Sequence, residues 1–272
     1  REKIFENIWI QPAAGDAGGA LGAALSAWYL HHSKAREVSK SNDSMRGGYI
    51  GPEYSDDQIE RELRRCGANF SKVTTEELIE QVAYAINDSK AVGWMQGRME
   101  FGPRALGSRS IIADPRSPLM QKQLNLKVKF RESFRPFAPS ILCEKVSEWF
   151  DHNSESPYML LVAEVRKDKR LKITAKEEGL FGIDKLNVSR SSIPAITHVD
   201  YTARIQTVHE DTNPLFHAVI SKFNEITGCP LVVNTSFNVR GEPIVCSPSD
   251  AFRCFMGTGI DMLAIGNFLL FK

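Results

Sequence analysis

The chain has 272 residues, of which 42% are hydrophobic and 25% charged, and its formal net charge is +1. These values are typical of a globular protein with a sizeable core, and they exclude a disordered tail. No uncharged apolar run approaches the ~20 residues that a bilayer span needs, so we expect no membrane role.

The cysteines indicate the compartment of the protein, and the first residue indicates its relation to a longer chain. Five cysteines are scattered along the chain without CxxC spacing, which predicts free thiols in a reducing compartment and hence a cytoplasmic protein. The chain begins with Arg1 rather than Met. We therefore expect it to be the C-terminal piece of something longer.

The first elements in chain order are a strand, a turn and a helix. Residues 8–10 form a short apolar run, residues 12–19 are rich in Gly, and Leu21, Leu25 and Trp28 recur at helical spacing. Residues 34–54 then lack any period and predict a linker. We place a domain boundary near residue 48.

Two capping boxes follow the linker. Ser55 with Gln58, and Thr74 with Glu77, each predict the start of a helix. Residues 91–95 then have the pattern of a buried strand.

The later part of the chain mixes strands and helices without strict alternation. The charged, weakly periodic residues 166–190 predict a surface excursion. We expect strands at 158–165, 203–208 and 230–235 and helices at 213–227 and 247–255. This mixture predicts an α/β or α+β fold, with a twisted mixed sheet and flanking helices.

Positive charge is concentrated in residues 93–140. This stretch holds nine Lys/Arg against three Asp/Glu, a formal charge of +6 that leaves the rest of the chain at −5. Arginine forks suit phosphate, and the glycines at 97, 102 and 107 let backbone N–H groups turn toward an anion. Interleaved apolar residues place some of these cations at the edge of the core, which predicts a pocket for a small polyanion. The basic clusters are Arg98, then Arg104 with Arg109, then Lys129, Arg131 and Arg135.

Two other interpretations of the basic stretch stay open. A Lys/Arg run is often only a solvated surface, although the buried aromatic residues argue against this here. Basic residues interleaved with aromatics also suit RNA, although the near-neutral total charge disfavours a broad nucleic-acid footprint.

A second polar group follows the apolar run at 230–233. Asn234, Ser236 and Asn238 present amide and hydroxyl groups that could orient a carbonyl or a nucleotide. The alternative is a strand that ends in an ordinary side-chain-supported turn.

Asp16 lies in the Gly-rich turn before the first helix. The position suits a metal or a hydroxyl ligand at a helix N-terminus. The alternative is that Asp16 caps the helix while Gly18, Gly19 and Gly22 permit close packing.

His198 and Asp200 are candidates for proton transfer, and Arg204 is a further candidate phosphate ligand. The alternation of His198 and Asp200 places them on one face of a strand, although a lone histidine is more often structural. The other histidines, His209 and His217 among them, show no spacing typical of a closed zinc site.

Four motifs together resemble the C-terminal region of the O-carbamoyltransferases of the nodulation-protein and antibiotic-tailoring type. The resemblance spans nearly the whole chain and rests on GRMEFGPRALGSRSI, NLKVKFRESFRPFAPS, HVDYTARIQTV and LVVNTSFNVRGEPIV. It implies that residues 1–48 are the tail of an actin/Hsp70-like (Kae1-like) domain plus a linker. Residues 49–272 would then resemble the threonylcarbamoyl-AMP synthases (YrdC-like fold).

The resemblance also implies site residues. The synthase-like fold binds its substrates with a KxR…SxN tetrad, which matches Lys129, Arg131, Ser236 and Asn238. The phosphate-binding set it implies is Lys129, Arg131, Arg104 and Arg204, while Ser236 and Asn238 orient the carbamoyl group or nucleotide. Further candidate substrate-binding residues are Arg98, Arg135, Asn234 and His198.

The activity implied is ATP-dependent carbamoyl transfer. Carbamoyl phosphate is cleaved to carbamate, which attacks the α-phosphate of ATP, with Mg²⁺ on the triphosphate, to give carbamoyladenylate and pyrophosphate. The carbamoyl group then passes to a hydroxyl of a small-molecule acceptor in the N-terminal domain, assisted by Fe²⁺ or another divalent metal. Asp16 matches the aspartate of that metal site, whose histidine ligands are expected upstream. The alternatives are an RNA-binding module and a non-catalytic interaction domain.

Overall fold

The computed structural model describes residues 4–5, 10–37 and 43–272. The predicted strand at 8–10 falls largely outside this part of the chain, as does part of the predicted linker at 34–54. Every predicted candidate residue for the site lies within it.

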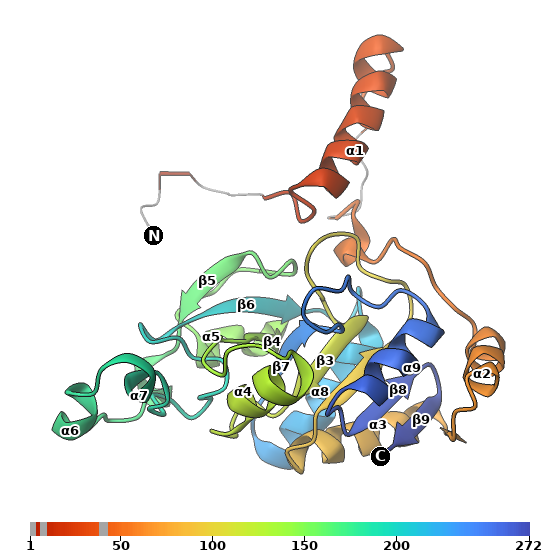
Figure 1. Cartoon of the computed structure of the whole chain (residues 1–272). Helices are drawn as coiled ribbons and strands as arrows, with labels where there is room; N and C mark the ends of the chain where they lie inside the picture. The colour runs from red at the N-terminus through yellow and green to blue at the C-terminus, as the bar shows by residue number, and fades with distance from the viewer. Residues whose placement is uncertain (1–3, 6–9, 38–42) are drawn as a thin grey trace.

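The centre of the fold is a nine-stranded mixed sheet with the strand order β1-β9-β8-β2-β3-β7-β4-β6-β5 (Figure 1). β2 is parallel to β8 and β4 is parallel to β6, whereas the other neighbours are antiparallel. The strands are β1 Ser71–Lys72, β2 Val92–Met95, β3 Arg109–Ala113, β4 Ala138–Leu142, β5 Leu161–Glu164, β6 Thr202–Val208, β7 Leu231–Ser236, β8 Met262–Ile265 and β9 Phe268–Phe271. The mixed sheet predicted from sequence is confirmed.

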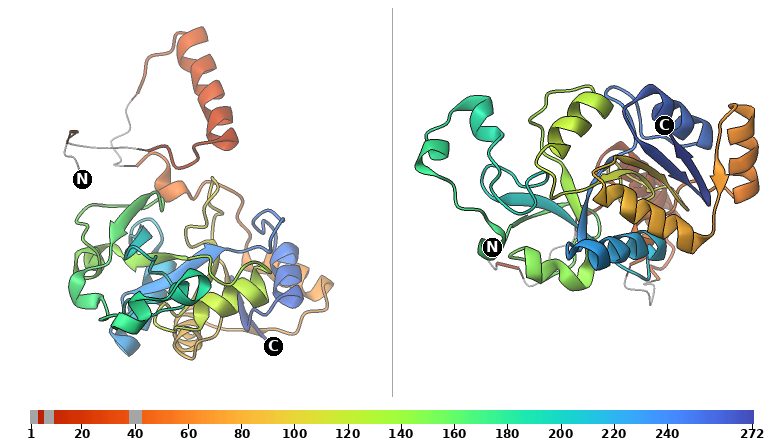
Figure 2. Two further views of the ribbon diagram at one scale, coloured as in Figure 1. Left: turned by 60° about the vertical axis from the view of Figure 1, so that its left-hand side comes forward. Right: turned by 90° about the horizontal axis from the view of Figure 1, so that it is seen from below.

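Helices flank the sheet on both faces. Figure 2 shows α3 and α8 on one face and α4 and α9 on the other, and α2 packs against α9. The helices are α1 Asp16–Ser26, α2 Asp56–Arg65, α3 Thr75–Asn87, α4 Met120–Gln123, α5 Val146–Trp149, α6 Ala175–Glu178, α7 Gly182–Leu186, α8 Pro214–Thr227 and α9 Pro248–Gly257.

The helix starts follow the capping signals in the sequence. Ser55 and Thr74 each accept a hydrogen bond from the third helical N–H, and the side chains of Gln58 and Glu77 each accept one from the N–H of the cap residue. α9 has the same arrangement at Ser247. These predicted helices are confirmed within two residues.

The strands predicted at 91–95, 158–165, 203–208 and 230–235 are confirmed with shifted ends. The strand predicted at 158–165 is shorter, because β5 begins only at Leu161, after the turn that contains Met159 with a φ of 55°. The sequence patterns did not predict β1, β3, β4, β8 or β9, of which β3 and β4 lie inside the basic stretch.

α1 projects away from the body of the fold (Figures 1 and 2) and buries none of its residues. Its N-cap is Gly15 rather than Asp16, and no side chain caps the helix there, so the predicted capping role of Asp16 is wrong. Of the glycines expected to permit close packing, only Gly18 does so: a Cβ there would lie 2.4 Å from the Ala13 carbonyl oxygen, whereas Gly19 and Gly22 have nothing within 4 Å.

Part of the predicted linker packs on the body. The Gly51 N–H donates to the Met99 carbonyl at 2.9 Å, and the Phe101 N–H donates to the Gly48 carbonyl at 2.7 Å. The Tyr49 hydroxyl donates to the Leu106 carbonyl at 2.6 Å. The domain boundary near residue 48 stays a prediction.

Residues 166–190 lie at one end of the molecule, where α6 and α7 stand apart from the sheet (Figure 1). Neither helix has a buried residue, as expected for a surface excursion. Within the described ranges, no helix combines the length and the apolar character that crossing a bilayer requires.

Candidate functional site

Five of the predicted site residues line one small cavity of about 170 Å³. They are Arg104, Arg131, Arg204, Asn234 and Ser236. They come from the loop before β3, the segment before β4, and strands β6 and β7. The remaining lining residues are Ala105, Pro136, Phe137, Ala138, Met159 and Thr235.

Asn234 lies on β7, between β3 and β4 in the sheet. Its side-chain amide donates to Ser140 Oγ at 2.9 Å, to Gln206 Oε1 at 3.0 Å and to the Ala105 carbonyl at 3.3 Å. Ser140 Oγ in turn donates to Gln206 Oε1 at 2.5 Å. The amide orientation is therefore fixed, and the buried Oδ1 of Asn234 is left without a partner among the described residues.

The loop that carries Arg104 is organised by a buried carboxylate. Glu100 Oε1 accepts the backbone N–H groups of Leu106 and Ser108, both at 2.7 Å, and of Arg109 at 3.0 Å. Three donors on one carboxylate oxygen hold the loop in a tight curve beside the cavity.

Arg109 supports the same loop from within the core. Its side chain is 1% exposed, and its guanidinium donates to the carbonyls of Gln96, Gly97, Ser108 and Pro52 at 3.0 to 3.2 Å. Arg109 therefore positions backbone and does not line the cavity, which corrects its pairing with Arg104 as a phosphate ligand.

Arg104 and Arg204 both leave a buried donor unused. The Nε atom of each lies buried with no hydrogen-bond partner among the described residues. The pKa of Arg204 is lowered by burial and, secondarily, by the positive charge of Arg104. Two neighbouring cations with unsatisfied donors are costly unless an anion lies between them.

A π-helical turn at Leu124–Val128 presents Lys129 and Arg131. Phe130 between them has a φ of 47°, a left-handed conformation that a non-glycine residue rarely adopts. Arg131 Nε donates to Asn125 Oδ1 at 2.6 Å, and its guanidinium lies 5.1 Å from the centre of the Phe137 ring. These contacts fix the direction of Arg131 toward the cavity.

Lys129 joins this turn to the end of β7. Its side chain is only 4% exposed. Nζ donates to the Ser236 carbonyl, to the Asn238 carbonyl at 3.0 Å and to Asn238 Oδ1 at 2.7 Å. Burial and the nearby charge of Arg131 lower the pKa of Lys129 to about 7. All four residues of the predicted tetrad therefore meet at this place.

Two predicted phosphate ligands lie outside the cavity lining. Arg98 pairs with Glu53 at 3.4 Å, and Arg135 pairs with Glu132 at 3.0 Å. All four of these side chains are more than 40% exposed, so both arginines belong to solvated ion pairs.

His198 and Asp200 lie in the turn before β6, so their predicted place on one strand face is wrong. The His198 N–H donates to the Thr202 carbonyl at 2.8 Å, and Asp200 Oδ1 accepts from the Thr202 hydroxyl at 2.7 Å. Burial lowers the pKa of His198. Its Nδ1 lies 3.1 Å from Thr202 Oγ1, and the contacts that the structure shows are those of a turn.

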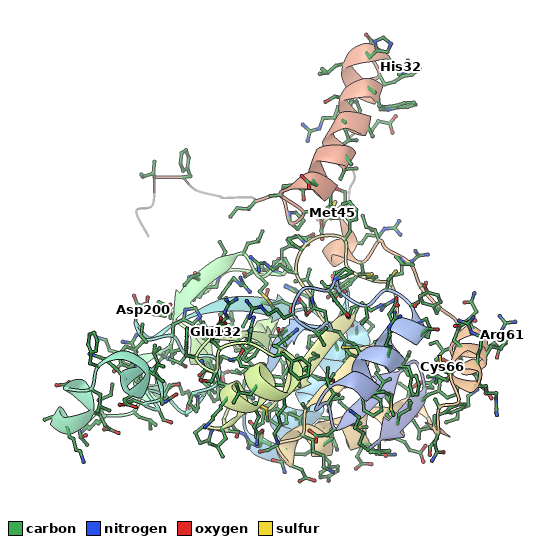
Figure 3. All side chains as sticks on the ribbon, viewed as in Figure 1. His32, Met45, Arg61, Cys66, Glu132 and Asp200 are labelled. Carbon is green, nitrogen blue, oxygen red and sulfur yellow. The ribbon has the colours of Figure 1, made fainter. Side chains whose placement is uncertain are left out.

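Neither the cavity lining nor the turn at Asp16 holds a complete set of metal ligands among the described residues. No carboxylate is among the described residues that line the cavity, so these residues alone offer Mg²⁺ none of the carboxylate ligands that it prefers. Asp16 supplies one carboxylate in the first turn of α1. His32 lies at the outer end of the projecting helix (Figure 3). Among the described residues, Asp16 belongs to no group of three or more metal-ligating side chains, so it does not form a metal site by itself.

Sequence reasoning missed Gln206 and Asn125, which orient Asn234 and Arg131. Gln206 follows Arg204 by two positions on β6, and the period of a strand places both on one face. Asn125 interrupts an apolar stretch, a pattern that often marks a buried polar residue with partners.

In comparisons with known proteins, one family matches most of the chain. The family "Carbamoyltransferase C-terminus" matches residues 83–272. The chain is 56% identical to an uncharacterised protein of Synechocystis, covering 100% of this chain and 44% of that protein. It is 41% identical to the nodulation protein NolNO of Sinorhizobium fredii, covering 100% of this chain and 37% of the relative.

A more distant relative is named for its activity. The 3'-hydroxymethylcephem-O-carbamoyltransferase of Amycolatopsis lactamdurans is 29% identical, over 97% of this chain and 44% of that enzyme. Among solved structures, full-length HypF in its phosphate- and nucleotide-bound form aligns with a TM-score of 0.44 and 16% identity, over 86% of this chain and 28% of that one. The chain spans less than half the length of these curated relatives. By its match over residues 83–272, the chain belongs to the carbamoyltransferase C-terminal family.

Proposed function

We propose that this chain is the adenylate-forming part of an O-carbamoyltransferase, which makes carbamoyladenylate from carbamoyl phosphate and ATP. The observation that carries the proposal is the small cavity in which Arg104, Arg131 and Arg204 converge without a carboxylate among its described lining residues. Membership of the carbamoyltransferase C-terminal family supports it. The hydroxyl acceptor and the metal-assisted transfer would then belong to the N-terminal domain of the whole protein.

The size of the cavity favours the smaller substrate. At about 170 Å³ it is smaller than the roughly 300–1,000 Å³ of pockets that enclose a drug-sized ligand. Carbamoyl phosphate is of this size, whereas a complete nucleotide is larger. We therefore place the carbamoyl and reacting phosphoryl groups in the cavity and the nucleoside outside it.

The chemistry requires anions to approach one another. Carbamoyl phosphate is hydrolysed to carbamate and phosphate; a carbamate oxygen then bonds to the α-phosphorus of ATP as the bond to pyrophosphate breaks. In the proposal, Arg104 and Arg204 bind phosphoryl oxygens through their unused donors, and Arg131 and Lys129 offset the charge that develops. Asn234 Oδ1, the buried acceptor without a partner among the described residues, suits the carbamoyl NH₂ group.

The proposal predicts pyrophosphate release from ATP that depends on carbamoyl phosphate. Ser236→Ala and Lys129→Ala are expected to lower the rate by about 10²-fold or more, because the first removes a hydroxyl that would orient the carbamoyl group and the second removes a cation that would offset developing charge. Lys222→Ala is the matched control, since this lysine pairs with Glu225 at 3.2 Å on the surface. Thermal melting of each variant checks that the fold is intact.

Absence of carbamoyl-phosphate-dependent pyrophosphate release, in a protein that still binds ATP, would contradict the proposal. So would a normal rate in a folded Ser236→Ala variant. Strongly salt-dependent RNA binding, unaffected by ATP, would support the RNA-binding alternative.

The lowered pKa of Lys129 predicts proton uptake on substrate binding. In the free protein this pKa is about 7, and an anion bound nearby raises it by favouring the ammonium form. Above about pH 7, binding therefore takes up a proton and weakens as the pH rises. Isothermal titration with carbamoyl phosphate, in two buffers of different ionisation enthalpy, measures this uptake. Unchanged uptake in Lys129→Met would show that another group titrates.

A further inference from the structure

A cluster of metal-ligating side chains lies where two neighbouring strands end. It is outside the arginine cavity, which is the cavity lined by Arg104, Arg131 and Arg204. β4 and β6 are parallel, and Leu142 pairs with Val208 at their last paired positions. The residues that directly follow these two strands are Cys143 and His209, respectively. Because parallel strands end at the same edge of a sheet, the register brings this thiol and this imidazole together.

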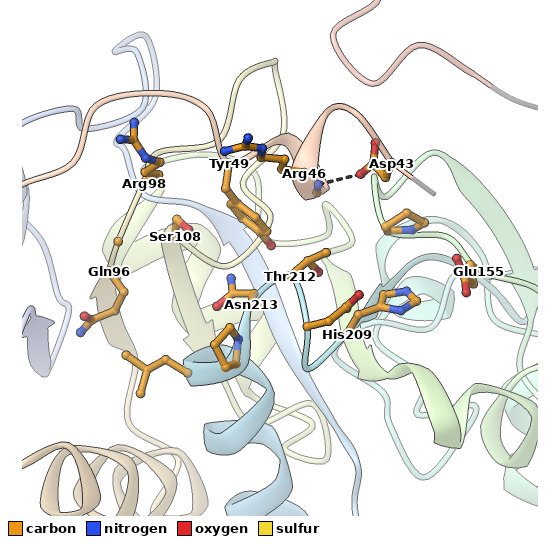
Figure 4. A pocket seen from close by; sticks show the side chains of 16 residues that line it. Asp43, Arg46, Tyr49, Gln96, Arg98, Ser108, Glu155, His209, Thr212 and Asn213 are labelled. Carbon is orange, nitrogen blue, oxygen red and sulfur yellow. Dashed lines mark hydrogen bonds between the residues drawn. The ribbon is translucent and has the colours of Figure 1, made fainter. Parts of the chain in front are cut away.

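Ser156, the next residue in the sequence, holds Glu155 against the same edge of the sheet. The Ser156 N–H donates to Thr207 Oγ1 at 2.8 Å, the Thr207 N–H donates to the Ser156 carbonyl at 3.0 Å, and Ser156 Oγ donates to the Ile205 carbonyl at 2.9 Å. Three hydrogen bonds from one residue fix where the chain passes β6. The Glu155 carboxylate is thereby placed beside His209, as Figure 4 shows.

The ligand atoms of Cys143, Glu155 and His209 all lie within 4.8 Å of one another. Two ligands of one tetrahedral zinc ion lie about 3.5 Å apart, given Zn–S and Zn–N bonds of about 2.3 and 2.0 Å. Small rotamer adjustments would close this difference. Glu155 is exposed and the other two residues are partly exposed, so an ion can enter from solvent.

Thr207 orients the imidazole. Its Oγ1 lies 3.1 Å from His209 Nε2 and also accepts the Ser156 N–H. With Nε2 as donor to this hydroxyl, the other ring nitrogen keeps its lone pair for a cation. A ring fixed by a hydrogen bond on its second nitrogen is the usual arrangement of a metal-ligating histidine.

Negative charge accumulates around the thiol. Glu155, Glu144 and Asp211 all act electrostatically on Cys143. Cys143, His209 and Asp211 line one cavity of about 710 Å³, and Glu155, His209 and Asp211 line another of about 720 Å³. The cluster therefore lies at the wall shared by two open cavities, where a divalent cation would offset the carboxylates.

We propose that Cys143, Glu155 and His209 bind one divalent transition-metal ion of the Zn²⁺ class, with water or Asp211 as the fourth ligand. A thiolate, an imidazole and a carboxylate form a borderline-soft ligand set, which favours Zn²⁺ or Co²⁺ over Mg²⁺ or Ca²⁺. The bound ion joins the ends of β4 and β6 to the segment that carries Glu155. This site is separate from the arginine cavity, and the proposal does not depend on that cavity's function.

The test is binding of Zn²⁺ and Co²⁺ to the purified, metal-stripped protein. We expect one equivalent of Zn²⁺ by titration calorimetry, and with Co²⁺ a sulfur-to-metal charge-transfer band in the near ultraviolet. Cys143→Ser is expected to abolish this band, and His209→Ala to weaken Zn²⁺ binding by at least about 100-fold. Glu155→Gln, which is also expected to weaken binding, changes an exposed residue and so keeps the test independent of folding.

His217→Ala is the matched control. His217 lines the same cavity as Cys143 but pairs with Glu144 at 3.1 Å, and this variant is expected to bind Zn²⁺ normally. Equal loss of binding in His217→Ala would overturn the proposed ligand set. So would a Co²⁺ complex without the charge-transfer band, or no uptake of either metal by the parent protein.

Discussion

Substituting Gly107→Ala is expected to lower the melting temperature of the protein by roughly 10 °C, a loss of about 3 kcal/mol or more in the free energy of unfolding. A Cβ at this position would lie 2.2 Å from Cδ1 of Phe216. Phe216 is fully buried on α8, and its ring centre lies 6.4 Å from that of Trp94. The aromatic rings therefore have little room to move away from the added methyl group.

The backbone at Gly107 adds to this cost. Its φ is +104°, which residues with a side chain rarely adopt. Its carbonyl accepts hydrogen bonds from Trp94 Nε1 at 2.9 Å and from Asn213 Nδ2 at 3.3 Å. Any shift that relieves the clash weakens these bonds and displaces the loop that carries Arg104.

Gly67→Ala is the control that separates strain from clash. Gly67 also has a positive φ, +68°, but a Cβ added there would have nothing within 4 Å. We expect only the strain cost there, of order 1 kcal/mol. Similar melting temperatures for the two variants, measured by differential scanning calorimetry, would contradict the close packing of Gly107 on Phe216.

The second large effect is expected at Arg204, where stability and binding should change in opposite directions. Arg204→Met removes a buried cation whose pKa is lowered by burial and by Arg104, so the melting temperature is expected to hold or rise. The same change removes a charged hydrogen-bond donor from the cavity. Affinity for carbamoyl phosphate is expected to fall about 10- to 100-fold, because such a bond contributes about 1.5–3 kcal/mol.

Arg253→Met serves as the control, because Arg253 is 78% exposed and pairs with Asp250 on the surface. It is expected to change neither the melting temperature nor the affinity beyond small amounts. Melting curves and titration calorimetry give both quantities. A folded Arg204→Met variant with undiminished affinity would show that Arg204 takes no part in anion binding.

The helices were the more predictable half of the fold. Capping boxes at Ser55 and Thr74 are local signals, and local hydrogen bonds decide where those helices begin. β3 and β4 were missed because the basic and polar residues of the stretch that contains them obscure their apolar runs. Each of them pairs with β7, about a hundred residues away in the sequence, as well as with a second strand, β2 for β3 and β6 for β4.

The residue types that line the arginine cavity were predictable, but which of the arginines face the cavity was not. Charge and family motifs pointed to Arg104, Arg131, Arg204 and Ser236, which the fold brings together. The charge pattern alone also grouped Arg109 with Arg104, although Arg109 is buried beneath the loop. Only the three-dimensional course of the loop decides which guanidinium faces the cavity and which faces backbone carbonyls.

The Cys143, Glu155 and His209 cluster was not predictable from spacing at all. Zinc motifs are recognised in sequence when their ligands are close neighbours, whereas these three residues lie on separate segments. The strand register of β4 and β6 brings them together, and that register is a property of the finished sheet.

The contact between Asn234 and Ala105 has a consequence for how the protein folds. The Asn234 amide reaches the Ala105 carbonyl across 129 positions of sequence, at 3.3 Å. Closing such a distant pairing is slow compared with forming the local helices. The capacity to bind an anion should therefore arise late in refolding, after most helical signal has returned, and ligand binding would then report completion of the native state.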